Sequence, residues 1–202
     1  MVERVWPRYI LAMNRTTPAL ISANGIGVIL MTLLVGPLFS PLEFSWINHT
    51  TSEQAGQQLP GAWIMRVGFV AYGLSTLLAA IVDSRTLPFV RGALIAFGIG
   101  LVGTAIWSNA SILPGVSSDM REDWLHSVAS GIVGTAFAVA CAARLFSPDG
   151  SKRDVLAWLG LVISVTVPLA MDAWPDFRGL LQRAMFGVSF VFVAREFKIL
   201  GR

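Results

Sequence analysis

The chain carries too little charge to be an ordinary soluble domain. Only 13% of its 202 residues are Asp, Glu, Lys or Arg and 54% are hydrophobic, whereas a soluble domain carries roughly 25% charged residues. The single cysteine, Cys141, excludes an intramolecular disulfide. The net charge of +3 is spread over segments between apolar runs. No basic stripe exists for a phosphate backbone to follow, so nucleic acid is not expected as a partner.

Sequence motifs that are typical of enzymes are absent as well. The sequence has no phosphate-cradling glycine-rich loop and no nucleophile elbow. It has only two histidines, His49 and His126, and no paired-histidine motif of the kind that binds zinc. We therefore expect neither a metal site nor a cofactor, and the sequence leaves open whether the protein is an enzyme.

Long hydrophobic runs are present. A membrane-spanning helix needs about 20 predominantly apolar residues, and six runs approach that length. They predict an all-α fold, a single domain over residues 1–202 that forms an integral membrane bundle of six transmembrane helices. The expected spans are 20–39, 62–82, 87–106, 124–146, 155–171 and 177–194.

Small residues at four-residue spacing suggest how these helices pack. The third run has Gly92, Ala96, Gly100 and Thr104, and the fourth has a similar stripe of Ser127, Gly131 and Thr135. Such stripes let helix backbones approach closely. They predict packing within the bundle, and the alternative is a face through which the protein forms a homo-oligomer.

The basic residues predict an orientation in the membrane, because Lys and Arg are enriched in cytoplasmic loops. With both termini in the cytoplasm, four of the fifteen basic residues belong to the outer half: Arg66, Arg121, Arg178 and Arg183. The remaining eleven belong to the inner side: Arg4, Arg8, Arg15, Arg85, Arg91, Arg144, Lys152, Arg153, Arg195, Lys198 and Arg202. We expect a multi-pass protein of the plasma (inner) membrane with its N- and C-termini cytoplasmic.

Two arginines fall inside predicted outer halves of spans. Charge in the hydrocarbon region costs about 2.5–3.5 kcal/mol on insertion scales, so Arg66 and Arg183 each need a partner. We expect both side chains to point into the bundle and to share carboxylate partners such as Glu53, Asp123 or Asp176.

The outer polar residues form the candidate site. His126 follows Glu122 by four residues, so both lie on one face of a helix. The candidate catalytic residues are His126 as the proton-transfer group and Glu122 or Asp123 as the carboxylate that orients it. The candidate ligand-binding residues are Arg66, Arg183, Gln182, His49 and Glu53. The sharpest expectation is that His126, Arg66 and Arg183 line one outward-facing cavity.

Three short motifs suggest a family. They are the run from His49 to Gln54, the run from Pro60 to Phe69 that includes Arg66, and the run from Gly179 to Arg183. Together with a histidine at the start of the fourth span, they resemble the bacterial and archaeal six-helix membrane family known as domain of unknown function 998. The resemblance covers most of the chain. It implies six transmembrane helices and a plasma-membrane location, and it assigns no catalytic residue.

Two hypotheses for function remain. In the first, the outer polar site binds or modifies a lipid-like or amphiphilic molecule, and membrane lipids are the partners. In the second, the protein is a transporter, or an auxiliary or structural membrane subunit without catalysis. Transport favours polar groups at mid-membrane, where this sequence offers mainly hydroxyls such as Thr76 and Ser164.

Overall fold

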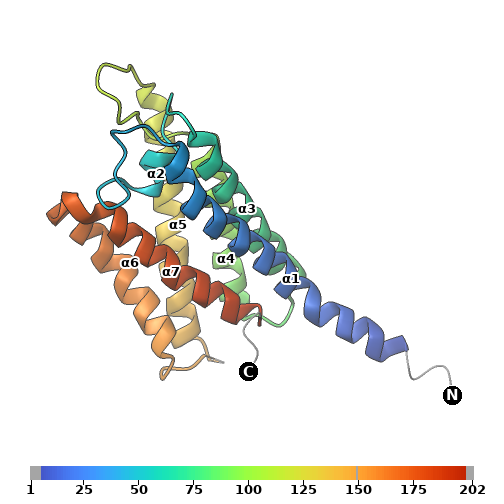
Figure 1. Cartoon of the computed structure of the whole chain (residues 1–202). Coiled ribbons are helices and arrows are strands. Elements are labelled where there is room, and N and C mark those ends of the chain that lie inside the picture. Colours follow the sequence, from blue (N-terminus) through green and yellow to red (C-terminus); the bar gives the residue numbers. More distant parts are fainter. Residues whose placement is uncertain (1–5, 149, 199–202) are drawn as a thin grey trace.

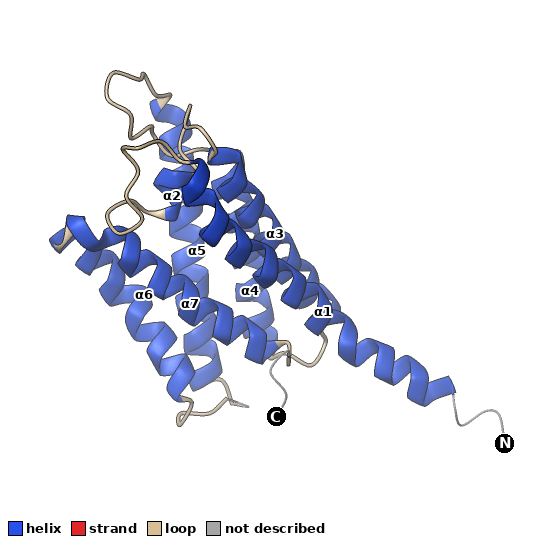
Figure 2. Cartoon of the chain, in the orientation of Figure 1, coloured by secondary structure: helices blue, strands red, loops and turns tan. Residues whose placement is uncertain are grey.

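The computed structural model describes residues 6–148 and 150–198, and these residues form helices and no strands (Figure 2). The six long helices are α1 (Trp6–Val35), α3 (Ala62–Val82), α4 (Pro88–Ile106), α5 (Met120–Phe146), α6 (Val155–Ala173) and α7 (Arg178–Glu196). Three short elements lie between them: η1 (Gly36–Phe39), α2 (Thr51–Gln54) and η2 (Pro175–Phe177).

The prediction of a six-helix membrane bundle is confirmed, because six helices are long and apolar enough to cross a membrane. The observed bounds differ mainly at helix starts. Helix α5 begins at Met120, four residues before the expected start, because the Asp119 carboxylate accepts hydrogen bonds from the backbone N–H groups of Arg121 and Glu122. The short helix α2 was not predicted.

The helices are arranged in chain order around the bundle. Helix α1 packs on α3, α3 on α4, α4 on α5, α5 on α6 and α6 on α7, and α7 closes the ring with a smaller contact to α1 (Figure 1). Aromatic rings fill the middle. The ring of Tyr72 meets Phe97 and Phe190 edge-on, with centroids 5.6 and 5.0 Å apart, and Phe137 meets Phe192 at 5.5 Å. This layer joins α3, α4, α5 and α7.

Glycines set the closest helix crossing. A Cβ added at Gly98 would lie 2.5 Å from the carbonyl oxygen of Gly73, so α3 and α4 touch through their backbones. Within the predicted stripes, Gly100 packs on α5, since a Cβ added there would lie 2.8 Å from a methyl carbon of Val133 and 3.1 Å from the Ala129 carbonyl oxygen. Gly92 and Gly131, by contrast, have nothing within 4 Å of their Cβ positions. Only part of each stripe therefore serves packing within the bundle.

The two ends of the bundle differ. We call the end covered by residues 36–61, 107–119 and 174–177 the capped end. We call the opposite end, where α1 begins and α7 ends, the terminal end (Figure 1). Short connections, residues 83–87 and 147–154, join helices there. Of the basic residues assigned to this side, Arg4 and Arg202 lie outside the described residues.

The crossing of α3 and α4 can be tested with one methyl group. We expect Gly98→Ala to lower the free energy of unfolding by about 1–3 kcal/mol, because backbone atoms of α3 must move to make room. Gly92→Ala, on the same helix but in open space, is the matched control and should leave stability unchanged or slightly raised. Unfolding midpoints in detergent measure both, and equal midpoints would contradict the close crossing.

Candidate functional site

A segment of the first connection at the capped end folds back into the bundle. Residues 50–57, which we call the 50–57 segment, include α2 and are buried except for Ser52, which is half-buried. Gln54 is only 2% exposed. Backbone N–H and C=O groups that leave water must find partners, so the surrounding side chains have to supply hydrogen bonds.

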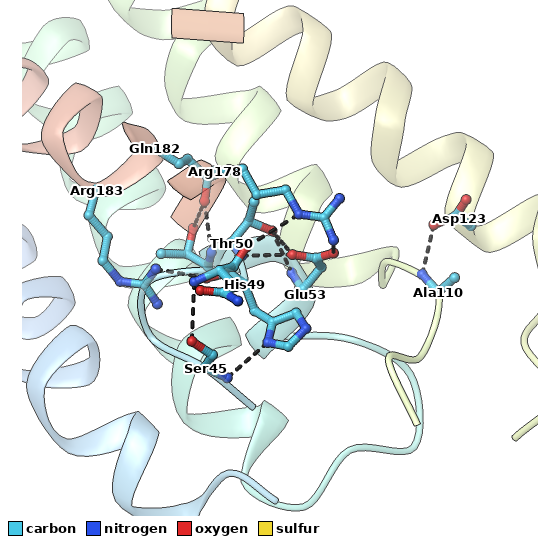
Figure 3. Close-up of polar contacts among 11 residues, drawn as sticks. Ser45, His49, Thr50, Glu53, Ala110, Asp123, Arg178, Gln182 and Arg183 are labelled. Carbon is cyan, nitrogen blue, oxygen red and sulfur yellow. Dashed lines mark hydrogen bonds and ion pairs between the residues drawn. The ribbon is translucent and has the colours of Figure 1, made fainter. Parts of the chain in front are cut away.

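The start of the segment is a capping box. The Thr50 hydroxyl accepts a hydrogen bond from the Glu53 backbone N–H at 3.0 Å, and the Glu53 carboxylate accepts one from the Thr50 backbone N–H at 2.7 Å. This reciprocal pair satisfies two N–H groups of a helix start. The other Glu53 oxygen lies 2.7 Å from the guanidinium of Arg178 (Figure 3). The Thr-x-x-Glu spacing is the sequence signal from which α2 could have been predicted.

Helix α7 holds the segment from one side (Figure 3). The amide oxygen of Gln182 accepts hydrogen bonds from the backbone N–H and the hydroxyl of Thr51, both at 2.7 Å. Arg183, 7% exposed, donates to the carbonyl oxygens of Trp46 and His49, both at 2.8 Å. Its second terminal nitrogen donates to the side-chain oxygen of Gln54 at 3.3 Å.

Gly179 makes this close contact possible. The Leu180 backbone N–H donates to the Ile47 carbonyl oxygen at 3.0 Å, so the connection lies directly on the first turn of α7. A Cβ at Gly179 would collide with the backbone carbonyl oxygens of His49 and Ile47. A residue with a side chain would therefore push residues 47–49 away from Arg183.

Helix α3 holds the other end of the segment. Arg66 is half-buried and donates to the carbonyl oxygens of Ala55 at 2.9 Å and Gly56 at 3.1 Å. The expectation that Arg66 and Arg183 point inward to hydrogen-bond acceptors is confirmed, whereas the expectation that they share carboxylate partners is wrong. Among the described residues, both guanidiniums hydrogen-bond backbone carbonyl groups, which saves the cost of burying additional carboxylates.

The second connection at the capped end, residues 107–119, is hydrogen-bonded to the same segment. The Gln57 side chain donates to the carbonyl oxygens of Ser108 and Asp119 and accepts from the Asp119 backbone N–H at 2.7 Å. Glu122 and Asp123 accept hydrogen bonds from the backbone N–H groups of Ser108 and Ala110, both at 2.7 Å. Figure 3 shows Asp123 and Ala110 apart from the side chains around Thr50.

His126 is buried, with 2% of its surface exposed. Its Nδ1 lies 2.8 Å from the Trp107 carbonyl oxygen and 3.2 Å from that of Thr104. A carbonyl oxygen only accepts, so Nδ1 carries a hydrogen. Nε2 is buried and has no hydrogen-bond partner among the described residues. The expected contact with Glu122 or Asp123 is replaced by the backbone contact to the end of α4.

A cavity of about 450 Å³ lies under the 50–57 segment, between α3, α4, α5, α6 and α7. Its walls are mainly apolar, with Phe69, Leu101 and Met185 among them. Hydroxyl and amide groups interrupt this lining: Ser52, Thr104, Ser130, Thr135, Ser164 and Gln182. The volume falls in the range of small-ligand sites.

The candidate ligand-binding and catalytic residues lie at different places around this cavity. Gln182 lines it, Glu53 belongs to the segment that covers it, and His49 and Arg183 lie beside that segment. Arg66, His126 and Arg183 do not line it, so the structure does not bring these three together in this cavity. His126 lies beside its wall, because Thr104 accepts from it and Ser130 is one turn further along α5.

His49 has a local role at the rim. Its Nδ1 accepts from the Ser45 backbone N–H at 2.8 Å, and its ring stacks on Phe44 with centroids 5.6 Å apart. No group of three or more His, Cys, Asp or Glu side chains that could hold a metal ion occurs in the part of the chain that the structure describes.

We call Gln182, Arg183 and Arg66 the braces of the 50–57 segment, because their side chains hydrogen-bond the segment or the residues just before it. The role of Arg183 as a brace can be tested by Arg183→Met, which keeps the approximate length of the side chain and removes its donors. We expect a loss of about 1–3 kcal/mol in the free energy of unfolding, because the part-buried carbonyl groups of Trp46 and His49 and the buried amide oxygen of Gln54 lose a donor. Residues 40–49 should also become sensitive to protease. The control is Arg121→Met, since Arg121 is exposed at the same end and its side chain has no polar partner among the described residues. Equal stability of the two variants would contradict the brace.

Comparison with known proteins gives one match. No curated protein and no solved structure matches the chain. Residues 23–194 match the family described as "Protein of unknown function (DUF998)", a range that includes all six spanning helices apart from the beginning of α1 and the last residues of α7. The braces of the 50–57 segment all fall within the matched residues. The chain therefore belongs to the DUF998 family of membrane proteins of unknown function.

Proposed function

We propose that the protein binds a single-chain amphiphile, such as a fatty acid or a lysolipid, in the cavity under the 50–57 segment. The observation that carries the proposal is the cavity itself, about 450 Å³ of mainly apolar lining with amide and hydroxyl groups at its capped end. Apolar walls with a few placed polar groups are typical of small-molecule sites.

Gln182 is the residue best suited to meet the polar group of such a ligand. Its amide oxygen is occupied by Thr51, whereas its amide nitrogen has no hydrogen-bond partner in the described part of the chain. Because this side chain lines the cavity, two N–H donors are available there. Ser52 adds a hydroxyl from the 50–57 segment.

A side entrance from the membrane fits the same ligand. Gly131 and Thr135 of α5 belong both to the wall of the cavity and to an apolar groove of about 460 Å³ between α4 and α5. Gly131 has no side chain and nothing within 4 Å of its Cβ position. The groove and the cavity thus adjoin at these two residues, which offers an acyl chain in the membrane a route toward the cavity.

The proposed orientation places the capped end outside and both termini in the cytoplasm of a plasma-membrane protein. The eleven-to-four distribution of Lys and Arg supports it. In this orientation the cavity belongs to the outer leaflet. The proposed function is binding, and the roles of His126, Glu122 and Asp123 in catalysis and of Arg66, Arg183, His49 and Glu53 in ligand contact remain predictions.

Filling the cavity tests the binding proposal. Gly134 lines the cavity and has nothing within 4 Å of its Cβ position, so Gly134→Leu adds bulk without a collision at the first carbon. With dansyl-labelled undecanoic acid as the probe, we expect binding by the variant to be weaker by about tenfold or more, equivalent to about 1.4 kcal/mol.

The matched control is Gly187→Leu. Gly187 lies on α7 in equally open space and does not line the cavity. Binding of the probe should be the same as in the unmodified protein. If the unmodified protein does not bind the probe, or if both variants bind it equally well, the cavity is not an amphiphile site. The outer polar residues then support the alternative of a structural or auxiliary subunit.

The orientation has its own test in a Cys141→Ala background. Ser117 at the capped end and Ser151 at the terminal end are both exposed, and their hydroxyls have no partner among the described residues. In intact spheroplasts, a membrane-impermeant maleimide should label Ser117→Cys and should label Ser151→Cys only after lysis. Labelling of Ser151→Cys in intact spheroplasts, with Ser117→Cys labelled only after lysis, would contradict the proposed orientation.

A further inference from the structure

The terminal end holds a second, polar cavity that the amphiphile proposal does not use. Its volume is about 260 Å³, and its lining comes from residues just after α3, from α5 and from the end of α7: Asp83, Arg85, Thr86, Arg144, Arg195, Glu196 and Lys198. This cavity is smaller than the sites of drug-sized ligands. It therefore suits a single compact polar group.

Three carboxylates and three arginines around the cavity are already paired. Arg195 donates to Asp154 at 2.6 Å and to Glu196 at 3.1 Å. The Nε of Arg144 lies 3.5 Å from Asp154 and 3.6 Å from Glu196. Asp154 also caps α6 by accepting from the Ala157 backbone N–H. This network joins the ends of α5, α6 and α7.

A separate ion pair lies just after α3, where Arg85 donates to Asp83 at 2.9 Å. Burial disfavours the charged carboxylates of Asp83 and Asp154, but the hydrogen bonds from Arg85 and Arg195 outweigh it, and the pKa of each acid is below its ordinary value. Both are therefore charged at neutral pH, and each neutralises one guanidinium.

Lys198 is a fourth cation without a fourth carboxylate. It lines the cavity, and no ion pair or side-chain hydrogen bond joins it to another described residue. The terminal nitrogens of Arg85 and Arg144 likewise have no hydrogen-bond partner in the described part of the chain. The cavity thus has an excess positive charge and several N–H donors that nothing in the described chain accepts from.

We propose that this cavity binds the phosphate group of an anion. A phosphate offers several acceptor oxygens to the guanidinium forks of Arg85 and Arg144 and a negative charge to Lys198. Two sources share this chemistry: the headgroup of an anionic phospholipid in the adjacent leaflet, and a soluble phosphate. Two arginines near this end, Arg91 and Arg153, add to the positive potential at that membrane surface.

The experiment compares two lysines on the purified full chain in neutral detergent. Lys198→Gln removes the unpaired cation of the cavity and breaks no described ion pair. Lys152→Gln removes an exposed lysine from the same end that does not line the cavity. Each protein is titrated with inorganic phosphate, with phosphatidylglycerol and with phosphatidylcholine, and the shift of the unfolding midpoint reports binding.

We expect Lys198→Gln to weaken binding by about fivefold, because a charge-assisted contact to the phosphate is lost. Lys152→Gln should change binding by less than about twofold, because Lys152 does not line the cavity. Phosphatidylglycerol binding without phosphate binding identifies a headgroup site, and saturable binding of both identifies the phosphate as the recognised group. Arg144→Gln, if it folds, should weaken binding further. The proposal is overturned if Lys198→Gln and Lys152→Gln bind with equal affinity, or if neither inorganic phosphate nor phosphatidylglycerol binds saturably.

Discussion

The structure depends on a stretch of backbone that leaves water and enters the helix bundle. Residues 50–57 carry N–H and C=O groups into a region with little water, where each unpaired group costs several kcal/mol. Arg66 from α3 donates to the carbonyl groups of Ala55 and Gly56, and Gln182 from α7 accepts from the Thr51 backbone N–H. Arg183 pairs the carbonyl groups of Trp46 and His49 just before the segment, and the Gln57 side chain extends the network to the second connection. The gathering of polar residues at one end of an apolar chain follows from this requirement.

The fold could be predicted from the sequence because each spanning helix is marked by a long run of apolar residues. Six apolar runs give six spans, and only their ends moved, as at α5, where the cap residue Asp119 sets the start. The details of the site were harder to predict. Arg66 and Arg183 were expected to pair with carboxylates, since opposite charges are the partners that a sequence displays. Their actual partners are main-chain carbonyl groups, which every residue has and no sequence pattern marks.

The motifs on which the family resemblance rests have a structural explanation. The run from His49 to Gln54 contains the first five residues of the 50–57 segment. The run from Pro60 to Phe69 contains Arg66 of α3, and the run from Gly179 to Arg183 contains Gln182 and Arg183 of α7. Two neighbouring motifs and a third more than 100 residues later in the chain thus meet in one network. Gln182 belongs both to this network and to the cavity wall, so occupation of the proposed site and the position of the 50–57 segment are physically linked through one side chain.

The order of the helices has a consequence for biogenesis. Neighbours in the chain are neighbours in the bundle from α1 to α7, so each helix can pack against its predecessor as it emerges from the ribosome. The 50–57 segment breaks this order, because it follows α1 directly but takes its key hydrogen bonds from α7. Until synthesis reaches the last span, the Thr51 backbone N–H and the carbonyl groups of Trp46 and His49 lack these partners. Insertion of α7 is therefore the step that locks the capped end, and a nascent chain that stops before it exposes unpaired backbone to membrane quality control.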